Sequence, residues 1–162
     1  MFDVPQVVVV DAGEHQLLFL DANSGKVVRR AGGRTKRGAH TLTDPQHACS
    51  SPAGVCLVSD WTAPNLRVFD ADLRPVTDFV TYGSGAGRML KPSGVCCDAH
   101  GYFFAADSHN HRVHVIGPDG RFVRMLLTET DHLEQPLALA TLESGRLAVT
   151  EARGAVKIFQ YM

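Results

Sequence analysis

The sequence predicts an all-β fold, and three observations lead to this prediction. The apolar runs are short, rich in Val, Phe, Leu and Ile, and separated by Gly, Asp, Asn and Pro, which is typical of strands joined by turns. Helical spacing of apolar residues is almost absent. The same order of runs and turns recurs along the chain, and 162 residues with 44% hydrophobic content can bury the core of one domain.

The recurring unit is defined by an acidic residue that ends an apolar run. A polar turn follows it, then a second apolar run, a short turn and, except at the end of the chain, a third run. We interpret each unit as strand, turn, strand, turn, strand. The aligned segments are VVVVDAGEHQLLFLDANSGKVVRR (Asp11), VCLVSDWTAPNLRVFDADLRPVTDF (Asp60), YFFAADSHNHRVHVIGPDGRFVRML (Asp107) and LAVTEARGAVKIFQYM (Glu151).

A fourth strand is expected ahead of these three. Two units carry matching leaders, SPAGVCLV and KPSGVCCD, which place Pro52 beside Pro92 and Cys56 beside Cys96. Four-stranded units that recur roughly every 45 residues indicate the blades of a β-propeller. The first unit lacks its leading strand and the last its trailing strand, so we predict a partial propeller of about three and a half blades. It would be a single domain, 1–162, with repeats at about 5–44, 45–90, 91–134 and 135–162.

The third unit resembles a known repeat. LKPSGVCCDAHGYFFAADSHNHRVHVIGPDGRFVRML resembles the NHL repeat, in which a strand ending in AD is followed by N-H-R-V; Asn110 and His111 match two of the letters that name it. The ending AVKIFQYM resembles the last blade of tripartite-motif NHL proteins, which are ubiquitin ligases. Repeat two departs from the pattern at Pro64, and repeat four has Glu151 for aspartate and a turn, ARGA, that we count as one residue shorter.

The resemblance implies a propeller with more blades than this chain supplies. A partial propeller would expose blade faces and strand edges. We therefore expect a segment of a longer propeller, a short isoform, or a half that self-associates to complete the ring; a four-bladed ring is the rarer alternative.

The stretch AADSHNHRVHVI, 105–116, contains several side chains that can bind a metal ion or act as acid or base. Asp and Asn stabilise tight turns, so we interpret it as a turn that braces the repeat. His109 and His111 could share a metal ion, but no third ligand has suitable spacing, so we predict neither metal nor cofactor. The residues assigned to the repeat itself are Asp11, Asp60, Asp107, Asn110, Arg112 and Glu151.

No catalytic site is predicted. YGSGAGR, Tyr82–Arg88, follows a strand but leads into another strand rather than a helix, so it is interpreted as a flexible linker between blades and not as a phosphate loop. No GxSxG motif occurs, and Cys96 and Cys97 lie in a predicted buried strand. The enzymatic alternative is a metal-dependent propeller lyase or lactonase, whose folds are related.

The segment KVVRRAGGRTKRGAHTLT, Lys26–Thr43, contains many basic residues and no acidic one. It is either a solvated loop or part of a binding face. In a four-stranded blade, the turn after the acidic residue and the connection to the next blade lie at the same end. Basic side chains there would contact phosphates, and Trp61 either stacks a base or anchors a peptide, or is a buried residue of its blade. The candidates for partner or RNA binding are Arg29, Arg30, Arg34, Lys36, Arg37, Trp61, His109, His111 and Arg153.

The amino-acid composition indicates which kinds of partner and which cellular compartment to expect. Sixteen basic and seventeen acidic side chains give a net charge of -1, so any nucleic-acid contact must use a local patch. The four cysteines lack CxxC or zinc spacing, and no signal sequence or membrane span is evident, so we expect a cytoplasmic protein with no membrane partner.

The expected function is recognition of a protein partner, with RNA binding as the alternative. The NHL resemblance implies both, since some relatives bind RNA on the loop-rich face and others bind proteins. No RING or B-box zinc ligands occur, so ubiquitin-ligase activity would need sequence outside this chain.

Overall fold

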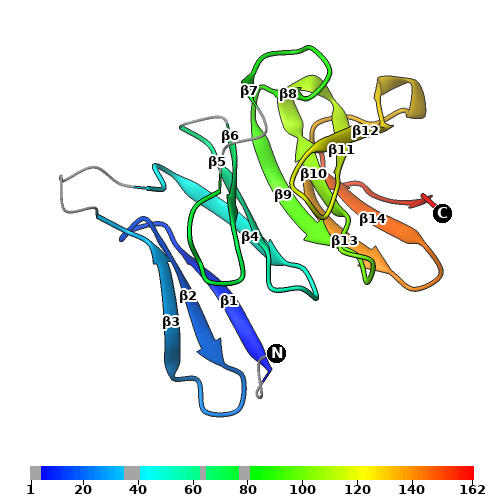
Figure 1. Cartoon of the computed structure of the whole chain (residues 1–162). Helices are drawn as coiled ribbons and strands as arrows, with labels where there is room; N and C mark the ends of the chain where they lie inside the picture. Colours follow the sequence, from blue (N-terminus) through cyan, green and yellow to red (C-terminus); the bar gives the residue numbers. More distant parts are fainter. Residues whose placement is uncertain (1–4, 35–40, 63–64, 77–80) are drawn as a thin grey trace.

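The structure is a computed structural model that describes residues 5–34, 41–62, 65–76 and 81–162. It is all-β, as predicted, and consists of small antiparallel sheets that stand side by side along the chain (Figure 1). Two single-turn 3-10 helices, η1 (Ser108–Asn110) and η2 (Glu129–Asp131), interrupt the strands. Among the described residues no helix is long and apolar enough to cross a membrane.

Four antiparallel sheets follow one another in chain order. The first comprises β1 (Gln6–Asp11), β2 (Gln16–Asp21) and β3 (Val27–Gly32), and the second β4 (Pro45–Ser50), β5 (Cys56–Asp60) and β6 (Asn65–Phe69). The third comprises β9 (Pro92–Cys97), β10 (Phe103–Asp107), β11 (Arg112–Ile116) and β12 (Phe122–Leu127), and the fourth β13 (Pro136–Leu142), β14 (Arg146–Glu151) and β15 (Val156–Gln160). A short parallel pair, β7 (Thr81–Tyr82) and β8 (Arg88–Met89), lies ahead of the third sheet.

Neighbouring sheets pack face to face, and the core lies between them. Leu17 and Phe19 of the first sheet pack in one cluster with Val58 and Phe69 of the second. The third sheet is covered on both faces, because all five positions of β10 are buried. Its Phe103 belongs to the cluster shared with the second sheet, whereas Phe104 belongs to the cluster shared with the fourth. Burial on both faces agrees with the apolar pattern of the sequence.

Among the described residues both end sheets have three strands, as predicted. In this part of the chain no strand lies ahead of β1 in the first sheet, and none follows β15 in the fourth. Beside β6 of the second sheet, Pro75 forms an isolated bridge with Phe69, and the Val76 N–H donates to the Val68 carbonyl at 2.8 Å. Residues 77–80 lie outside the described part of the chain, and within that part the third sheet is the one with four strands. The number of propeller blades stays a prediction.

The predicted alignment of the leaders is wrong. Pro52 lies in the turn before β5, whereas Pro92 begins β9. The equivalent prolines are Pro45, Pro92 and Pro136, which begin the leading strands and lie opposite Asp60, Asp107 and Glu151 in the paired strands. The two leaders share letters because a turn and a strand can both accommodate Pro and Gly.

The turn ARGA is one residue shorter than the others, as predicted. Asp107 pairs with Arg112 across its turn, with four residues between them, and the first two acidic residues have the same spacing. In the last hairpin Thr150 pairs with Val156 and the Glu151 N–H donates to the Ala155 carbonyl at 2.9 Å, so only three residues separate Glu151 from the residue that it faces.

Candidate functional site

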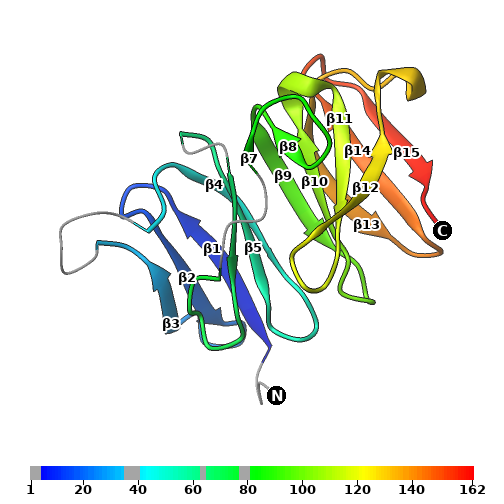
Figure 2. The same cartoon turned by 45° about the horizontal axis from the view of Figure 1, so that its top comes forward.

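The turns after the four acidic residues all lie at one end of the sheets. The segments that lead into β4, β9 and β13 lie there as well, because those strands begin opposite the acidic residues. We call this end, made by these turns and leading segments, the acid-end face. Figure 2 shows its neighbouring loops along the upper edge of the third and fourth sheets.

A repeated set of hydrogen bonds fixes each leading segment to its sheet. The Asp60 carboxylate accepts from the backbone N–H groups of Thr43 and Asp44 at 2.6 and 2.9 Å. Asp107 accepts in the same way from Leu90 at 3.0 Å, and Glu151 from Glu134 at 2.7 Å. Buried carboxylates need such donors. The acidic residue of each repeat thus anchors the chain where it enters the sheet.

A backbone bond accompanies each carboxylate. The residue after the acid donates its N–H to the carbonyl of the residue before the leading proline. The distances are 3.0 Å for Trp61 to Asp44, 3.0 Å for Ser108 to Lys91, and 3.1 Å for Ala152 to Gln135. Turn and leading segment are therefore held together in the second, third and fourth sheets.

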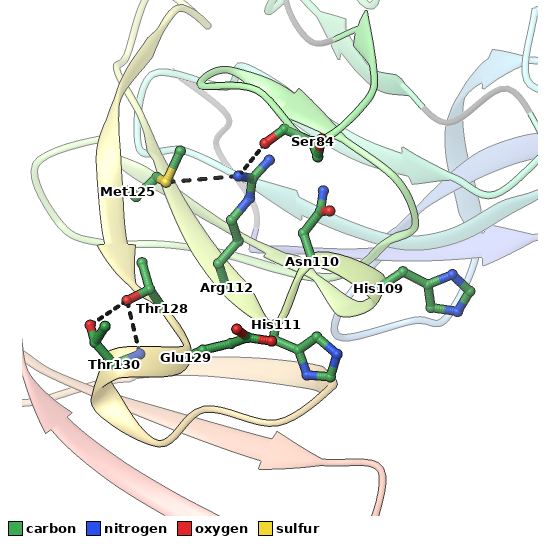
Figure 3. Close-up of a pocket in the computed structure, with 9 residues that line it drawn as sticks. All are labelled: Ser84, His109, Asn110, His111, Arg112, Met125, Thr128, Glu129 and Thr130. Atoms are coloured by element: carbon green, nitrogen blue, oxygen red, sulfur yellow. Dashed lines mark hydrogen bonds between the residues drawn. The ribbon is translucent and has the colours of Figure 1, made fainter.

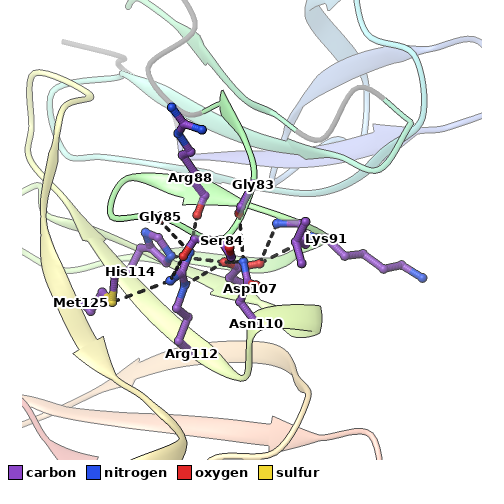
Figure 4. A network of polar contacts seen from close by, with 11 residues as sticks. Gly83, Ser84, Gly85, Arg88, Lys91, Asp107, Asn110, Arg112, His114 and Met125 are labelled. Carbon is purple, nitrogen blue, oxygen red and sulfur yellow. Dashed lines mark hydrogen bonds and ion pairs between the residues drawn. The ribbon is translucent and has the colours of Figure 1, made fainter.

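The Asp107 network is the most elaborate of these anchors (Figure 4). Its fully buried carboxylate accepts from Asn110 Nδ2 at 2.7 Å and from Arg112 Nε at 2.9 Å, and His114 Nε2 lies 3.3 Å away. Burial opposes ionisation of Asp107, but the contacts with His114, Asn110 and the Leu90 N–H outweigh it and hold its pKa below 3.8. A charged carboxylate is therefore stable inside the third sheet.

Arg112 extends this network to the glycine-rich connection. Its guanidinium donates from Nη1 to the Ser84 carbonyl at 2.8 Å and from Nη2 to the Gly85 and Arg88 carbonyls at 3.0 and 2.6 Å. The segment Tyr82–Arg88, interpreted from the sequence as a flexible linker, is thus tethered to the third sheet. The planar fork of arginine suits such multiple acceptors.

Asp11 has simpler surroundings. Its carboxylate accepts from the Glu14 N–H at 3.1 Å and from Gln16 Nε2 at 3.0 Å, both within the turn that it opens. The hydrogen bond from Gln16 is the main cause that lowers its pKa. In the first sheet the acid thus orders only its own turn.

A pocket of about 440 Å³ opens on the acid-end face of the third sheet, beside η1 and η2. Figure 3 shows His109 of η1 and His111, the residue after η1, on one side of it and Ser84 above it. His109 is exposed, whereas His111 is partly buried and its Nδ1 accepts the Gln135 N–H at 3.2 Å. That bond joins the third sheet to the fourth. The pocket lining comprises Ser84, His109, Asn110, His111, Arg112, Met125, Thr128, Glu129 and Thr130.

Two further candidates lie on the same face. The Lys91 ammonium stands 4.0 Å from the centre of the Trp61 ring, a cation–π contact between the second sheet and the segment leading into the third. Trp61 is 38% exposed, so it is neither a buried core residue nor fully free. Arg153, in the last turn, pairs with Glu134 at 3.1 Å across the solvent-exposed surface.

The basic run is only partly a loop, and this corrects the prediction. Its residues 27–32 form β3, and Arg29 lies toward the opposite end of the first sheet, where it donates to the Ala71 carbonyl at 2.6 Å. Arg30 lies 3.4 Å from the Gln16 side-chain oxygen, and Arg34 follows β3 at the acid end. Lys36 and Arg37 lie outside the described residues.

Metal binding and thiol chemistry find no support in the described part of the chain. It contains no group of three or more His, Cys, Asp or Glu side chains placed to hold a metal ion. The four cysteines are free. Burial raises the pKa of Cys56 to about 11 and that of Cys96 to about 12, which keeps these thiols protonated and unreactive at neutral pH.

Comparison with known proteins gives partial similarities. No family model matches the chain. Protein lin-41 of Caenorhabditis elegans is 39% identical over 49 residues, which are 30% of this chain and 4% of that protein. E3 ubiquitin-protein ligase TRIM71 is 42% identical over 48 residues in Rattus norvegicus and 40% over 48 in Xenopus tropicalis, in each case 30% of this chain and 6% of the relative.

The matched segment is close in length to one repeat and spans a small part of each relative. Two of the three relatives carry names that state ubiquitin-ligase activity. The similarity is consistent with the relationship to tripartite-motif NHL proteins that the third unit predicts, and it covers 30% of the chain.

Proposed function

We propose that this chain is a non-enzymatic recognition segment that binds a protein partner through the acid-end face. The observation that carries the proposal is the continuity of that face. Trp61 meets Lys91, Ser108 is bonded to Lys91, and His111 is bonded to Gln135. Loops from three sheets therefore form one rigid surface, which suits recognition of a macromolecule.

The charges of the face favour protein over nucleic acid. Arg153 pairs with Glu134, Lys157 pairs with Glu151 at 2.8 Å, and Lys91 is engaged with Trp61. Two of these cations are thus already paired with carboxylates and the third lies against an aromatic ring, whereas nucleic-acid surfaces gain affinity from cations that are free to contact phosphates. Tryptophan and arginine, both present on this face as Trp61 and Arg153, are residue types enriched at protein interfaces.

The test compares two matched triple variants in cells. One carries Trp61→Ala, His109→Ala and Arg153→Glu on the acid-end face; the control carries Tyr102→Ala, His100→Ala and Arg121→Glu, exposed residues at the opposite end. Affinity purification with quantitative mass spectrometry should show partners lost from the first variant and kept by the control. Equal partner lists for both variants and the wild type would contradict the proposal.

RNA binding by the same face is the second candidate, and it is motivated by the basic run. Reversal of Arg34, Lys36 and Arg37 to glutamate should abolish retention of single-stranded and hairpin RNA and flatten the salt dependence of binding. A wild-type chain that shows no salt-dependent RNA binding would leave protein recognition as the function.

The assignment to a ubiquitin ligase rests on the partial similarity to TRIM71 and on the NHL resemblance. In this proposal the chain selects the substrate, and a RING outside it supplies ligase activity. The purified chain should therefore fail to support ubiquitin transfer in a reconstituted reaction, and transfer by the chain alone would overturn this assignment. The free cysteines support a reducing compartment, and we place the protein in the cytoplasm.

The four sheets are proposed to be blades of a partial propeller. Three contacts support this: β9 contacts both β4 and β13, and β1 contacts β4, as expected when the first strand of each sheet lies near a common axis. Light scattering with small-angle X-ray scattering tests how the ring closes. A compact particle of twice 17.6 kDa would indicate self-association, and an open monomer would indicate completion by further sequence.

A further inference from the structure

Two clefts at the end of the sheets opposite the acid-end face occupy equivalent places in the repeats. The first lies between the first and second sheets and is lined by Pro5, Gln6, Val8, Phe19, Arg29, Ser50, 52–54, Ala71 and Asp72. The second lies between the third and fourth sheets and is lined by Asp98, Tyr102, Phe104, Val115, Val123, Arg124, Tyr161 and Met162.

Strand pairing shows which residues correspond. Phe19 lies opposite Arg29 in the first sheet, and Val115 lies opposite Arg124 in the third. Each cleft thus has an apolar side chain from the second strand of its acid-turn hairpin and an arginine from the strand beside it.

Ala71 in the first cleft and Tyr161 in the second also occupy equivalent positions. Phe69 lies opposite Cys56 in the second sheet, and Phe159 lies opposite Leu147 in the fourth. Two residues beyond each phenylalanine stand Ala71 and Tyr161. Alanine therefore occupies the position that tyrosine holds in the other cleft.

This exchange accounts for the sizes of the clefts. The Tyr161 ring lies 4.7 Å from the Phe104 ring, tilted by 60°, and packs against the cluster between the third and fourth sheets. The cleft beside it measures about 270 Å³. The methyl group of Ala71 fills no such space, and its cleft measures about 830 Å³. The larger cleft is within the range of ligand sites, roughly 300–1,000 Å³.

We propose that the open cleft between the first and second sheets binds an aromatic side chain of a protein partner. In this proposal the partner's aromatic ring lies over Val8, the residue equivalent to Phe104, and beside Phe19. Arg29 is already placed to meet it: its guanidinium carbon stands 5.8 Å from the centre of the Phe19 ring, and its Nη2 is fixed by the Ala71 carbonyl. A cation held this way attracts the face of a further ring.

The partner segment is an extended peptide rather than a free aromatic molecule. In the occupied cleft the ring arrives on extended chain, because Tyr161 directly follows β15 and its N–H donates to the Gly145 carbonyl at 2.9 Å. Gly54 holds the equivalent position in the open cleft and lines it. The cleft lining also includes Gln6, Ser50 and Asp72, whose polar side chains can hydrogen-bond to a peptide backbone. This site is separate from the acid-end face, so neither proposal depends on the other.

The test uses two capped tripeptides, N-acetyl-Gly-Tyr-Gly-amide and its leucine counterpart, followed by two-dimensional NMR of the labelled chain. The tyrosine peptide should give saturable shifts at Val8, Phe19 and Arg29, and the leucine peptide should bind at least tenfold more weakly. Ala71→Tyr, which copies Tyr161, should weaken tyrosine-peptide binding at least tenfold because the cleft is then filled.

Two further variants keep the proposal open to refutation even where Ala71→Tyr fails to fold. Arg29→Gln removes the cation and should weaken binding several-fold. Tyr161→Ala should open the second cleft and add shifts at Phe104 and Arg124. The proposal is overturned by the absence of saturable shifts at the first cleft, by equal binding of both peptides, or by unchanged binding in Ala71→Tyr and Arg29→Gln.

Discussion

The third sheet and the first sheet carry the same acidic residue in very different surroundings. Asp107 is fully buried, contacts Asn110, Arg112 and His114, and anchors the segment that leads into its own sheet. Asp11 bonds only to groups of its own turn. The difference follows from the leading strand, which the third sheet has and the first lacks. The acid of the repeat therefore joins segments only where a leading strand brings them beside it.

The largest loss of stability is expected from a substitution in the third sheet. Asp107→Asn removes the anion that faces Arg112 and leaves a buried cation unpaired, which should lower the free energy of unfolding by about 3–5 kcal/mol. Asp11→Asn is the matched control and should change it little, because its partners are solvent-accessible. Urea unfolding followed by circular dichroism measures both. Similar losses for the two variants would contradict the comparison.

Arg112→Lys tests the tether of the glycine-rich connection. Lysine keeps the charge but cannot reach the Ser84, Gly85 and Arg88 carbonyls together, so a loss of about 2 kcal/mol is expected. Hydrogen exchange should also accelerate in 82–89. Arg30→Lys, which alters a single contact at 3.4 Å, is the control and should have no comparable effect. Unchanged exchange in 82–89 would show that the tether is not needed.

Acid sensitivity sharpens the comparison further. The folded pKa values of Asp107 and Glu151 lie below their ordinary values, so both stabilise the fold at neutral pH. This contribution is fully present above the unfolded pKa values, about 4, and is lost as the pH falls through the folded values. Stability should therefore decline below about pH 5. In Glu151→Gln the decline should be shallower, and an identical pH profile would refute the role of the Lys157–Glu151 pair.

The smallest effect is expected at the contact between the second and third sheets. Lys91→Gln removes the cation above Trp61 and should cost about 0.5 kcal/mol, because the ring is partly exposed. Trp61 is the single tryptophan, so its fluorescence reports the change directly. Lys26→Gln, at an exposed position of the first sheet, is the control. An emission spectrum identical to that of the wild type would show that the contact does not persist in solution.

The sequence was sufficient to predict the strands and the common end of the acid turns, because both depend on local patterns. The leader alignment failed because Pro-x-Gly-Val-Cys occurs once in a turn and once in a strand. A better signal was available: Pro45, Pro92 and Pro136 each precede the acid of their repeat by the same number of residues. This spacing is not a local pattern, because the proline and the acidic residue lie in different strands.

The contacts of individual side chains could not be predicted from the sequence, since they arise from packing between repeats. The basic run was assigned as a whole to a loop on the binding face, although the repeat predicts a strand at VVRR; residues 27–32 form β3, and Arg29 bonds to Ala71 away from the acid-end face. The stacking of Lys91 on Trp61 joins residues from different sheets, and no sequence spacing indicates it. The chemistry of the turns was thus more predictable than the partners of their side chains.

The central claim is that the acid-end face recognises the partner. Hydrogen-exchange mass spectrometry of the chain, free and bound to a partner identified by affinity purification, tests it most directly. Binding should slow exchange in the turns around Trp61, 108–111 and 152–154, and leave the turns at 99–101 and 118–121 unchanged. Protection confined to the latter turns, or spread equally over both ends, would contradict the account.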